Sequence, residues 1–183
     1  MRNSAPLIVL LCFVLAGCWQ TATRPYRNVM SLQPFAAGMV TTTDRDGRVA
    51  HYSLRKIDRG RYRVMQMGRG QDFGQGFEAG FFLLPGAPSN VLVLQMAALN
   101  FHTGDDNLRY YGLLVVKGPN SAEEIDPDCG KDARTALLRA HYPQGACAFA
   151  DRGSLEKALL ALWKSGRKQD YSLSLEPAIG SPK

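Results

Sequence analysis

The stretch FFLLPGAPSNVLVL, residues 81–94, decides the fold. Its two apolar runs, residues 81–84 and 91–94, are separated by six residues rich in Pro and Gly, and neither run alternates between apolar and polar side chains. Short apolar runs bounded by such turn residues are typical of strands that are buried on both faces. We therefore expect two strands here, with other parts of the chain covering both of their faces.

More strands are predicted on either side of this stretch. We expect them at residues 37–43, 48–57, 61–67, 77–84, 91–99 and 108–117, with a last short strand around 171–175. Asp44-Arg45-Asp46-Gly47 provides the Asp-Gly pair that a tight hairpin favours. In the strand that follows, Ala50, Tyr52 and Leu54 alternate with polar residues, which predicts one buried and one solvated face.

A helix is predicted over residues 154–165, with Ser154 as its N-cap and Gly166 as its stop. Its apolar residues recur at helical spacing, which indicates a core-packing face: Leu155, Ala158, Leu159, Leu162 and Trp163. A weaker second helix is expected over residues 132–141. The fold class is thus α+β, mainly an antiparallel β meander that is sandwich- or barrel-like, with one or two C-terminal helices.

The N-terminal sequence is typical of a targeting segment. A single charge at Arg2 precedes an apolar run over residues 6–14, which is too short to span a bilayer, and Leu15-Ala16-Gly17-Cys18 closes it. This stretch resembles the lipobox of bacterial lipoproteins, which implies acylation of Cys18 and removal of residues 1–17. The alternative is that Cys18 is an ordinary buried thiol, but the apolar character ends directly after it.

Three segments follow from this interpretation. Residues 1–17 are a cleaved signal peptide, residues 18–34 a lipidated N-terminus and flexible tether, and residues 35–183 a single globular β-rich domain. Some of residues 18–34 are apolar and could pack on that domain. Lipoproteins of this kind tend to stay in the inner membrane when an acidic residue follows the cysteine. Trp19 therefore indicates the outer membrane, with the domain facing the periplasm.

Cys129 and Cys147 are the two cysteines left once Cys18 is acylated and Cys12 is removed with the signal. In an oxidising compartment two remaining cysteines usually pair, so we expect a disulfide between them. A metal site is the alternative, but two thiols at this spacing with His141 as the nearby imidazole are a poor ligand set.

The order of these features resembles that of uncharacterised bacterial lipoproteins. The resemblance rests on the lipobox, Gly60-Arg61-Tyr62, the strand Tyr110-Tyr111-Gly112-Leu113-Leu114, Asp126-Pro127-Asp128-Cys129, and a second cysteine before a Leu-rich helix. It covers most of the mature chain and implies no activity.

Catalytic motifs are incomplete, so no catalytic residue, metal or cofactor is predicted. Ser154-Leu155-Glu156-Lys157 has the Ser-x-x-Lys spacing of penicillin-binding enzymes without their other motifs, and it suits a helix start better. His102, Asp105 and Asp106 could form an acid/base or metal cluster, but they fall in six residues that have the composition of a solvated turn.

The sequence alone leaves two functions open. The first is a non-enzymatic binding or scaffolding module, attached to the membrane by its lipid and contacting an envelope protein through a candidate loop with Arg69, Gln71, Asp72 and Phe73. The second is a small envelope hydrolase or ligand-binding enzyme whose site is dispersed in sequence. The formal net charge of +6 comes without a clear run of five basic residues, so no nucleic-acid partner is expected.

Overall fold

The computed structural model describes residues 19–21, 25–26, 28–67, 76–98, 109–127, 149 and 151–177. These residues form nine strands, one 3-10 turn and one α-helix. In chain order they are β1 (Trp19–Thr21), β2 (Gly38–Asp44), β3 (Val49–Lys56), η1 (Asp58–Gly60), β4 (Tyr62–Met67), β5 (Gly76–Leu83), β6 (Val91–Ala98), β7 (Arg109–Gly118), β8 (Ser121–Ile125), α4 (Arg152–Lys164) and β9 (Tyr171–Pro177).

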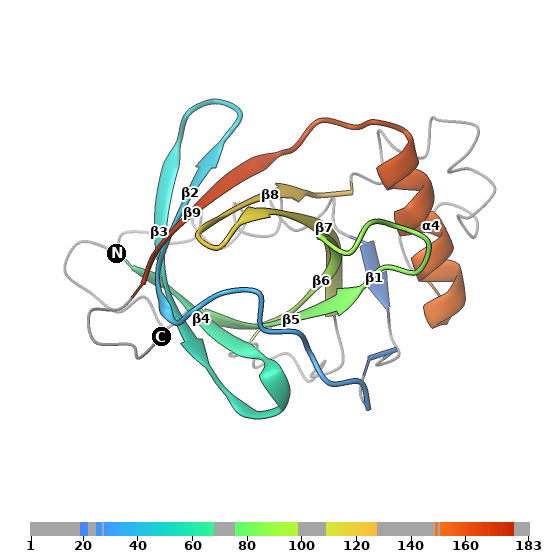
Figure 1. Ribbon diagram of the computed structural model, residues 1–183, viewed down its shortest axis with the longest axis horizontal. Helices are drawn as coiled ribbons and strands as arrows, with labels where there is room; N and C mark the ends of the chain where they lie inside the picture. Colours follow the sequence, from blue (N-terminus) through green and yellow to red (C-terminus); the bar gives the residue numbers. More distant parts are fainter. Residues whose placement is uncertain are drawn as a thin grey trace, which may run out of the picture.

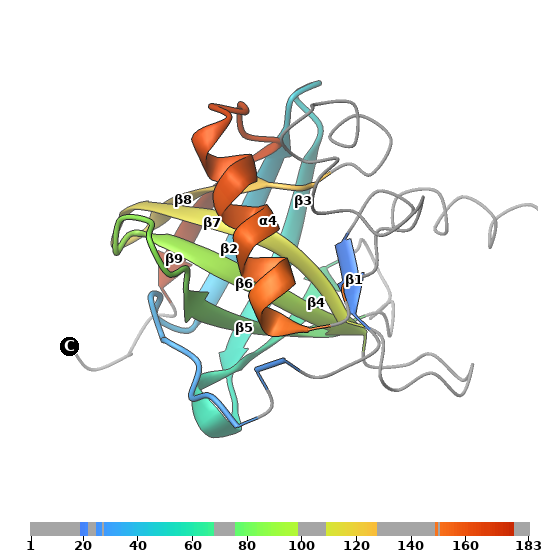
Figure 2. The same ribbon diagram turned by 90° about the vertical axis from the view of Figure 1, so that its right-hand side faces the viewer.

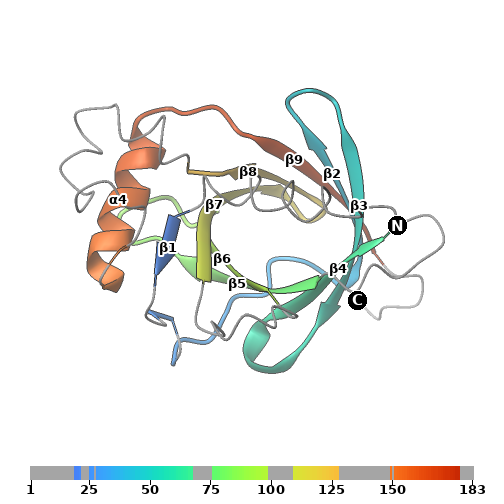
Figure 3. The same ribbon diagram turned by 180° about the vertical axis from the view of Figure 1, so that it is seen from behind.

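Eight of the strands close into an antiparallel barrel. Each strand from β2 to β8 pairs with the next along the chain, and β9 pairs with both β8 and β2. Figures 1 and 3 show the resulting ring of strands from opposite sides. The predicted antiparallel meander is therefore confirmed in its barrel-like form. The second predicted helix, over residues 132–141, lies outside the described residues.

The barrel interior is one apolar core. All eight barrel strands contribute buried side chains to it, which only the inside of the ring allows: Val40, Leu54, Tyr62, Val64, Ala79, Phe81, Leu92, Leu94, Leu114, Ala122 and Leu175. Phe35, just before β2, belongs to the same core and accepts a hydrogen bond from the Tyr62 hydroxyl at its carbonyl oxygen, 2.6 Å away.

A second core lies on the outer face of β5, β6 and β7, beneath α4 (Figure 2). Phe82, Val91 and Val93 face outward into it, while Phe81 and Leu92 face the interior. Leu155, Leu159 and Leu162 of α4 pack there with no exposed surface. The expectation that residues 81–94 are covered on both faces is confirmed, because the barrel covers one face and α4 the other.

The helix begins earlier than predicted. Asp151, not Ser154, is the N-cap, and its carboxylate accepts a hydrogen bond from the Ser154 amide at 2.8 Å. Ser154 lies inside the first turn, where its hydroxyl donates to the Asp151 carbonyl oxygen. The hydrogen bond to the Ser154 amide also helps to lower the pKa of Asp151, because it stabilises the carboxylate form. Among the described residues, no helix is long and apolar enough to cross a membrane.

The described residues between positions 19 and 34 contact the barrel. β1 pairs with the start of β7, where Trp19 lies opposite Tyr111. Tyr26 is fully buried under α4, stacks on Phe82 with 4.2 Å between ring centroids, and donates a hydrogen bond to Glu156. The sequence pattern allowed for such packing through the apolar residues of this segment.

Candidate functional site

A polar group lies in the otherwise apolar interior, on β8. Ala122 belongs to the interior core, and Glu124, two residues on, therefore points to the same side of the strand. Its cross-strand partners are Leu114, also in the interior core, and Tyr171 of β9. Glu123 points outward, where it forms an ion pair with Lys117 at 2.8 Å.

Side chains around Glu124 keep part of their surface accessible. Tyr52 of β3 packs against the interior core and interacts electrostatically with Glu124. The part-exposed residues that face this region are Thr42, Tyr52, Glu124 and Tyr171. Glu124 is surrounded by protein, yet it retains accessible surface. The side chains around Phe81 are, in contrast, almost fully buried.

Glu124 and Asp126 form a carboxyl pair. Burial is the main cause that raises the pKa of Glu124 well above its ordinary value, and the charge of Asp126 and a hydrogen bond with it act in the same direction. The pKa of Asp126 is raised as well, again chiefly by burial. The charge of Arg167 lowers the pKa of Asp126, but burial outweighs it, so the pair retains a proton more readily than exposed carboxyls do.

Asp126 has an oxygen without a partner. Its Oδ1 is buried and makes no hydrogen bond in the described structure. This oxygen lies over Gly112 of β7, and a Cβ at that position would come within 3.4 Å of it. Gly112 is opposite Leu94, an interior residue, so the space left by the missing side chain is on the inside of the barrel. Glycine thus gives the Asp126 carboxyl room beside the interior face of β7.

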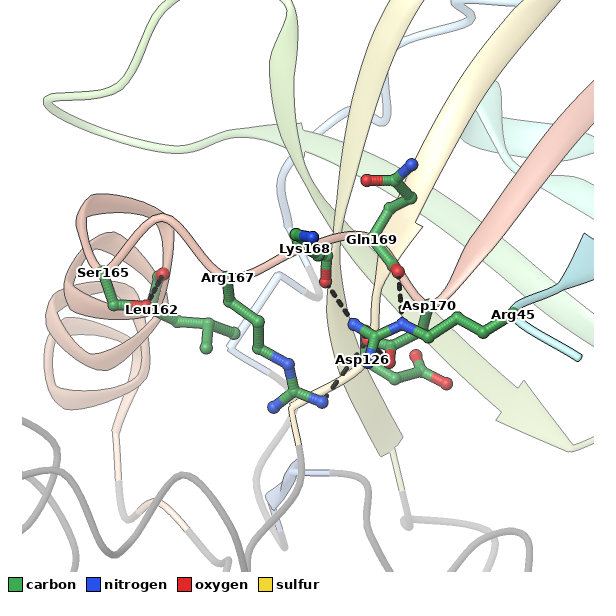
Figure 4. A network of polar contacts seen from close by, with 8 residues as sticks. All are labelled: Arg45, Asp126, Leu162, Ser165, Arg167, Lys168, Gln169 and Asp170. Atoms are coloured by element: carbon green, nitrogen blue, oxygen red, sulfur yellow. Dashed lines mark hydrogen bonds and ion pairs between the residues drawn. The ribbon is translucent and has the colours of Figure 1, made fainter.

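Asp170, in contrast, is well paired (Figure 4). Its Oδ2 accepts hydrogen bonds from the backbone amide of Asp126, at 2.9 Å, and from the guanidinium of Arg167, at 3.4 Å. Its Oδ1 forms an ion pair with the guanidinium of Arg45 at 3.2 Å. Arg45 also donates to the carbonyl oxygens of Lys168 and Gln169, at 2.6 and 2.7 Å. These contacts fix the segment between α4 and β9, and they place two cations on Asp170.

Two tyrosines bring hydroxyl groups to the pair. Burial, followed by the charges of Asp126 and Glu124, raises the pKa of Tyr171 to about 12. Burial and the charge of Glu124 also raise the pKa of Tyr52. Both phenols therefore stay protonated at neutral pH and can donate a hydrogen bond or present a ring face. Together with the carboxyls they offer recognition groups for a small polar or cationic molecule.

The structure does not describe the candidate site residues that the sequence singled out. The following residues lie outside the described part of the chain: Cys18, Cys129, Cys147, the loop with Arg69, Gln71, Asp72 and Phe73, and the cluster of His102, Asp105 and Asp106. The lipid anchor, the disulfide, the binding loop and the enzyme alternative therefore stay predictions.

Sequence reasoning missed Glu124 because it missed β8. The segment Ser121-Ala122-Glu123-Glu124-Ile125 has two adjacent acidic residues and little apolar content, so it did not resemble a strand. The available signal was the alternation of Ala122 and Glu124 with Glu123, after the turn residues Pro119 and Asn120.

Comparisons with known proteins identify no relative. No family model matches the chain, and neither a curated protein nor a solved structure matches it significantly. Among the described residues, no group of three or more His, Cys, Asp or Glu side chains is arranged to hold a metal ion.

Proposed function

We propose that the protein is a lipid-anchored, non-enzymatic binding module of the bacterial outer membrane, attached through Cys18 and facing the periplasm, and that its barrel takes up a small ligand. The observation that carries the ligand proposal is the part-exposed polar group inside a closed barrel, formed by Thr42, Tyr52, Glu124 and Tyr171. Barrels of eight strands either fill their interior with side chains or hold one small molecule.

The two ends of the barrel interior differ, and the difference favours an interior that holds a small molecule. Phe35, Tyr62 and Phe81 pack edge to face, with ring centroids 5.5 to 5.9 Å apart, and are almost fully buried. Around Glu124 the inward side chains of Thr42, Tyr52 and Tyr171 are polar and remain partly accessible. A folded core gains nothing from polar groups that it cannot fully pair, whereas binding sites commonly combine an apolar wall with a few polar groups.

Two neighbouring threonines of β2 allow a matched test. Thr42 faces the interior, opposite Leu173 and close to Tyr52, and Thr41 faces outward, where it contacts His51. Thr42→Phe should fill the space beside Glu124, whereas Thr41→Phe leaves the interior unchanged. The measurement is the melting temperature of the mature protein against a panel of small cationic, neutral and anionic compounds.

We expect members of the panel to raise the melting temperature of the wild type and of Thr41→Phe, because a ligand that binds only the folded state adds about 2.7 kcal/mol at one hundred times its Kd. The same compounds should have little effect on Thr42→Phe. Equal responses of the two variants would show that the ligand binds elsewhere, and a panel without any response would remove the proposed ligand role.

A further inference from the structure

The carboxyl pair of Glu124 and Asp126 differs from the other described acidic clusters in forming no ion pair, although the charge of Arg167 acts on Asp126. Asp44 and Asp46 contact Arg48, Glu78 contacts Arg61, and Asp170 contacts Arg45 and Arg167. No ion pair joins Glu124 or Asp126 to a described lysine or arginine. A buried acid without a counter-charge is costly, and structural acids are normally paired.

A second, independent feature is the unpartnered oxygen of Asp126. Its Oδ1 is buried beside the interior face of Gly112 and accepts no hydrogen bond from any described group. Buried carboxylate oxygens almost always have a donor, so this oxygen indicates a donor other than the described residues. The group that fits must be small enough to enter the interior and must carry several donors.

The side chains around the carboxyl pair indicate what else the ligand should contain. Tyr171 is the direct cross-strand neighbour of Glu124, and Tyr52 lies on the other side, so two aromatic rings accompany the pair. Beyond Tyr52, the partly buried Phe77, Met96 and Leu173 continue the apolar wall. Carboxylates and ring faces together are the groups that bind an organic ammonium, through charge-assisted hydrogen bonds and cation–π contacts.

We infer that the interior binds a small organic amine in its ammonium form, with the nitrogen at the carboxyls of Glu124 and Asp126 and its apolar body toward Phe77 and Met96. This inference rests on the proposed ligand function and names its class. On binding, the carboxyl pair gives up its retained proton to the solvent, and the ammonium donates hydrogen bonds to the carboxylates formed. The exchange conserves charge within the site.

Binding in which an ammonium replaces the proton of the carboxyl pair depends on pH. The acid pair must be ionised to receive the cation, so affinity should rise with pH as the pair loses its proton. The other titratable or charged groups of the elements around the pair are Asp44 and Arg45 from β2 and its hairpin, Tyr52 from β3, Tyr110 on the inner face of β7, Arg167 and Asp170 before β9, and Tyr171 on β9. The raised pKa values of Tyr52 and Tyr171 keep these two phenols protonated through neutral pH, so the carboxyl pair dominates the change.

The test uses three probes of similar size on the mature protein: 2-phenylethylamine, 2-phenylethanol and 3-phenylpropionate. Isothermal titration calorimetry at pH 5.5 and pH 8, in buffers with different ionisation enthalpies, gives both affinity and the number of protons released. We expect the amine to bind about tenfold or more tightly at pH 8 than at pH 5.5, with proton release, and the other two probes to bind at least about tenfold more weakly.

Two adjacent glutamates provide the matched variants. Glu124→Gln keeps the size of the side chain but removes one of the two inner carboxyls, and it should lower amine affinity about tenfold or more and weaken its pH dependence. Glu123→Gln removes an outer charge and should change neither. Circular dichroism confirms that both variants are folded.

Two results would overturn the inference. The first is an alcohol or carboxylate that binds as tightly as the amine, and the second is amine binding that Glu124→Gln leaves unchanged. The first result still places a ligand in the barrel if Thr42→Phe prevents it, so the proposed function would survive while the ligand class would be wrong.

Discussion

Glu124 is the residue whose position the fold alone explains least. It sits among Leu114, Ala122 and Tyr171, where an apolar side chain would pack without cost. Replacing a poorly compensated buried acid with a neutral side chain commonly stabilises a protein, and residues that lower stability without structural benefit are concentrated at functional sites. The stability of a variant at this position therefore bears on function as well as on folding.

Glu124→Gln should make the protein more stable at alkaline pH. The folded-state pKa of Glu124 is raised, so the folded state holds a proton that the unfolded state has lost. The wild type is then at full stability below the ordinary glutamate pKa and loses stability as pH rises toward the raised value. Each unit of that elevation corresponds to about 1.4 kcal/mol, which the amide avoids.

Chemical denaturation at several pH values measures this effect. The free energy of unfolding of Glu124→Gln should approach that of the wild type near pH 4 and exceed it at pH 8. Glu123→Gln is the control, because it removes only a surface ion pair with Lys117, worth about 0 to 1 kcal/mol. A wild type that is more stable than Glu124→Gln at pH 8 would mean that the buried carboxylate is better compensated than its contacts suggest.

At the scale of elements, α4 joins the barrel wall to the N-terminal segment. Its apolar side packs on β5, β6 and β7, and Glu156 on its first turns accepts the hydrogen bond from the Tyr26 hydroxyl at 3.0 Å. Arg152 bonds to the same glutamate at 2.7 Å and lies over the Tyr26 ring, 4.6 Å from its centroid. Burial and the charge of Glu156 raise the pKa of Tyr26, so its hydroxyl remains a donor.

Leu159→Ala tests how much this element contributes. The side chain has no exposed surface, so its truncation should cost about 2 to 5 kcal/mol of unfolding free energy, from lost burial and from the cavity that remains. Lys157→Ala, on the exposed side of the same helix, is the control and should leave stability nearly unchanged. Denaturant unfolding of both variants gives the comparison. A loss under about 0.5 kcal/mol for Leu159→Ala would mean that the helix is peripheral to the fold.

On the scale of the whole molecule, β1 determines how close a lipid at Cys18 would be to the barrel. Trp19 is hydrogen-bonded into the sheet opposite Tyr111, and consecutive Cα atoms are only about 3.8 Å apart. An acylated Cys18 would therefore join the barrel wall directly, without a long free tether. The proposed anchor would hold the barrel close to the membrane surface, where an amine in the periplasm could still reach its interior.

Cys18→Ala should abolish membrane attachment. Without the acylated cysteine the chain would carry no lipid and would keep its signal segment, so detergent-phase partitioning should fall and the mass should exceed that of the mature wild type. Cys12→Ala, inside the segment to be removed, is the control and should behave like the wild type. Detergent-phase partitioning and intact mass are the measurements. A Cys18→Ala protein with wild-type partitioning and mature mass would contradict the lipoprotein hypothesis.

Sequence alone determined the parts of this protein that depend on neighbours along the chain. The β3 alternation, the hairpin at Gly47 with its positive φ, the two apolar runs of residues 81–94 and the Leu-rich helix are all local patterns. Each is present, and the helix differs from its prediction only in its ends, because Asp151 rather than Ser154 caps it. The tertiary structure decided the closure of the ring, in which β9 lies between β8 and β2, and the choice of a barrel over a sandwich. It also brought together Tyr52, Glu124 and Tyr171 from three distant strands. Strand order and register depend on which long-range pairings bury the most apolar surface together, and no single segment carries that information.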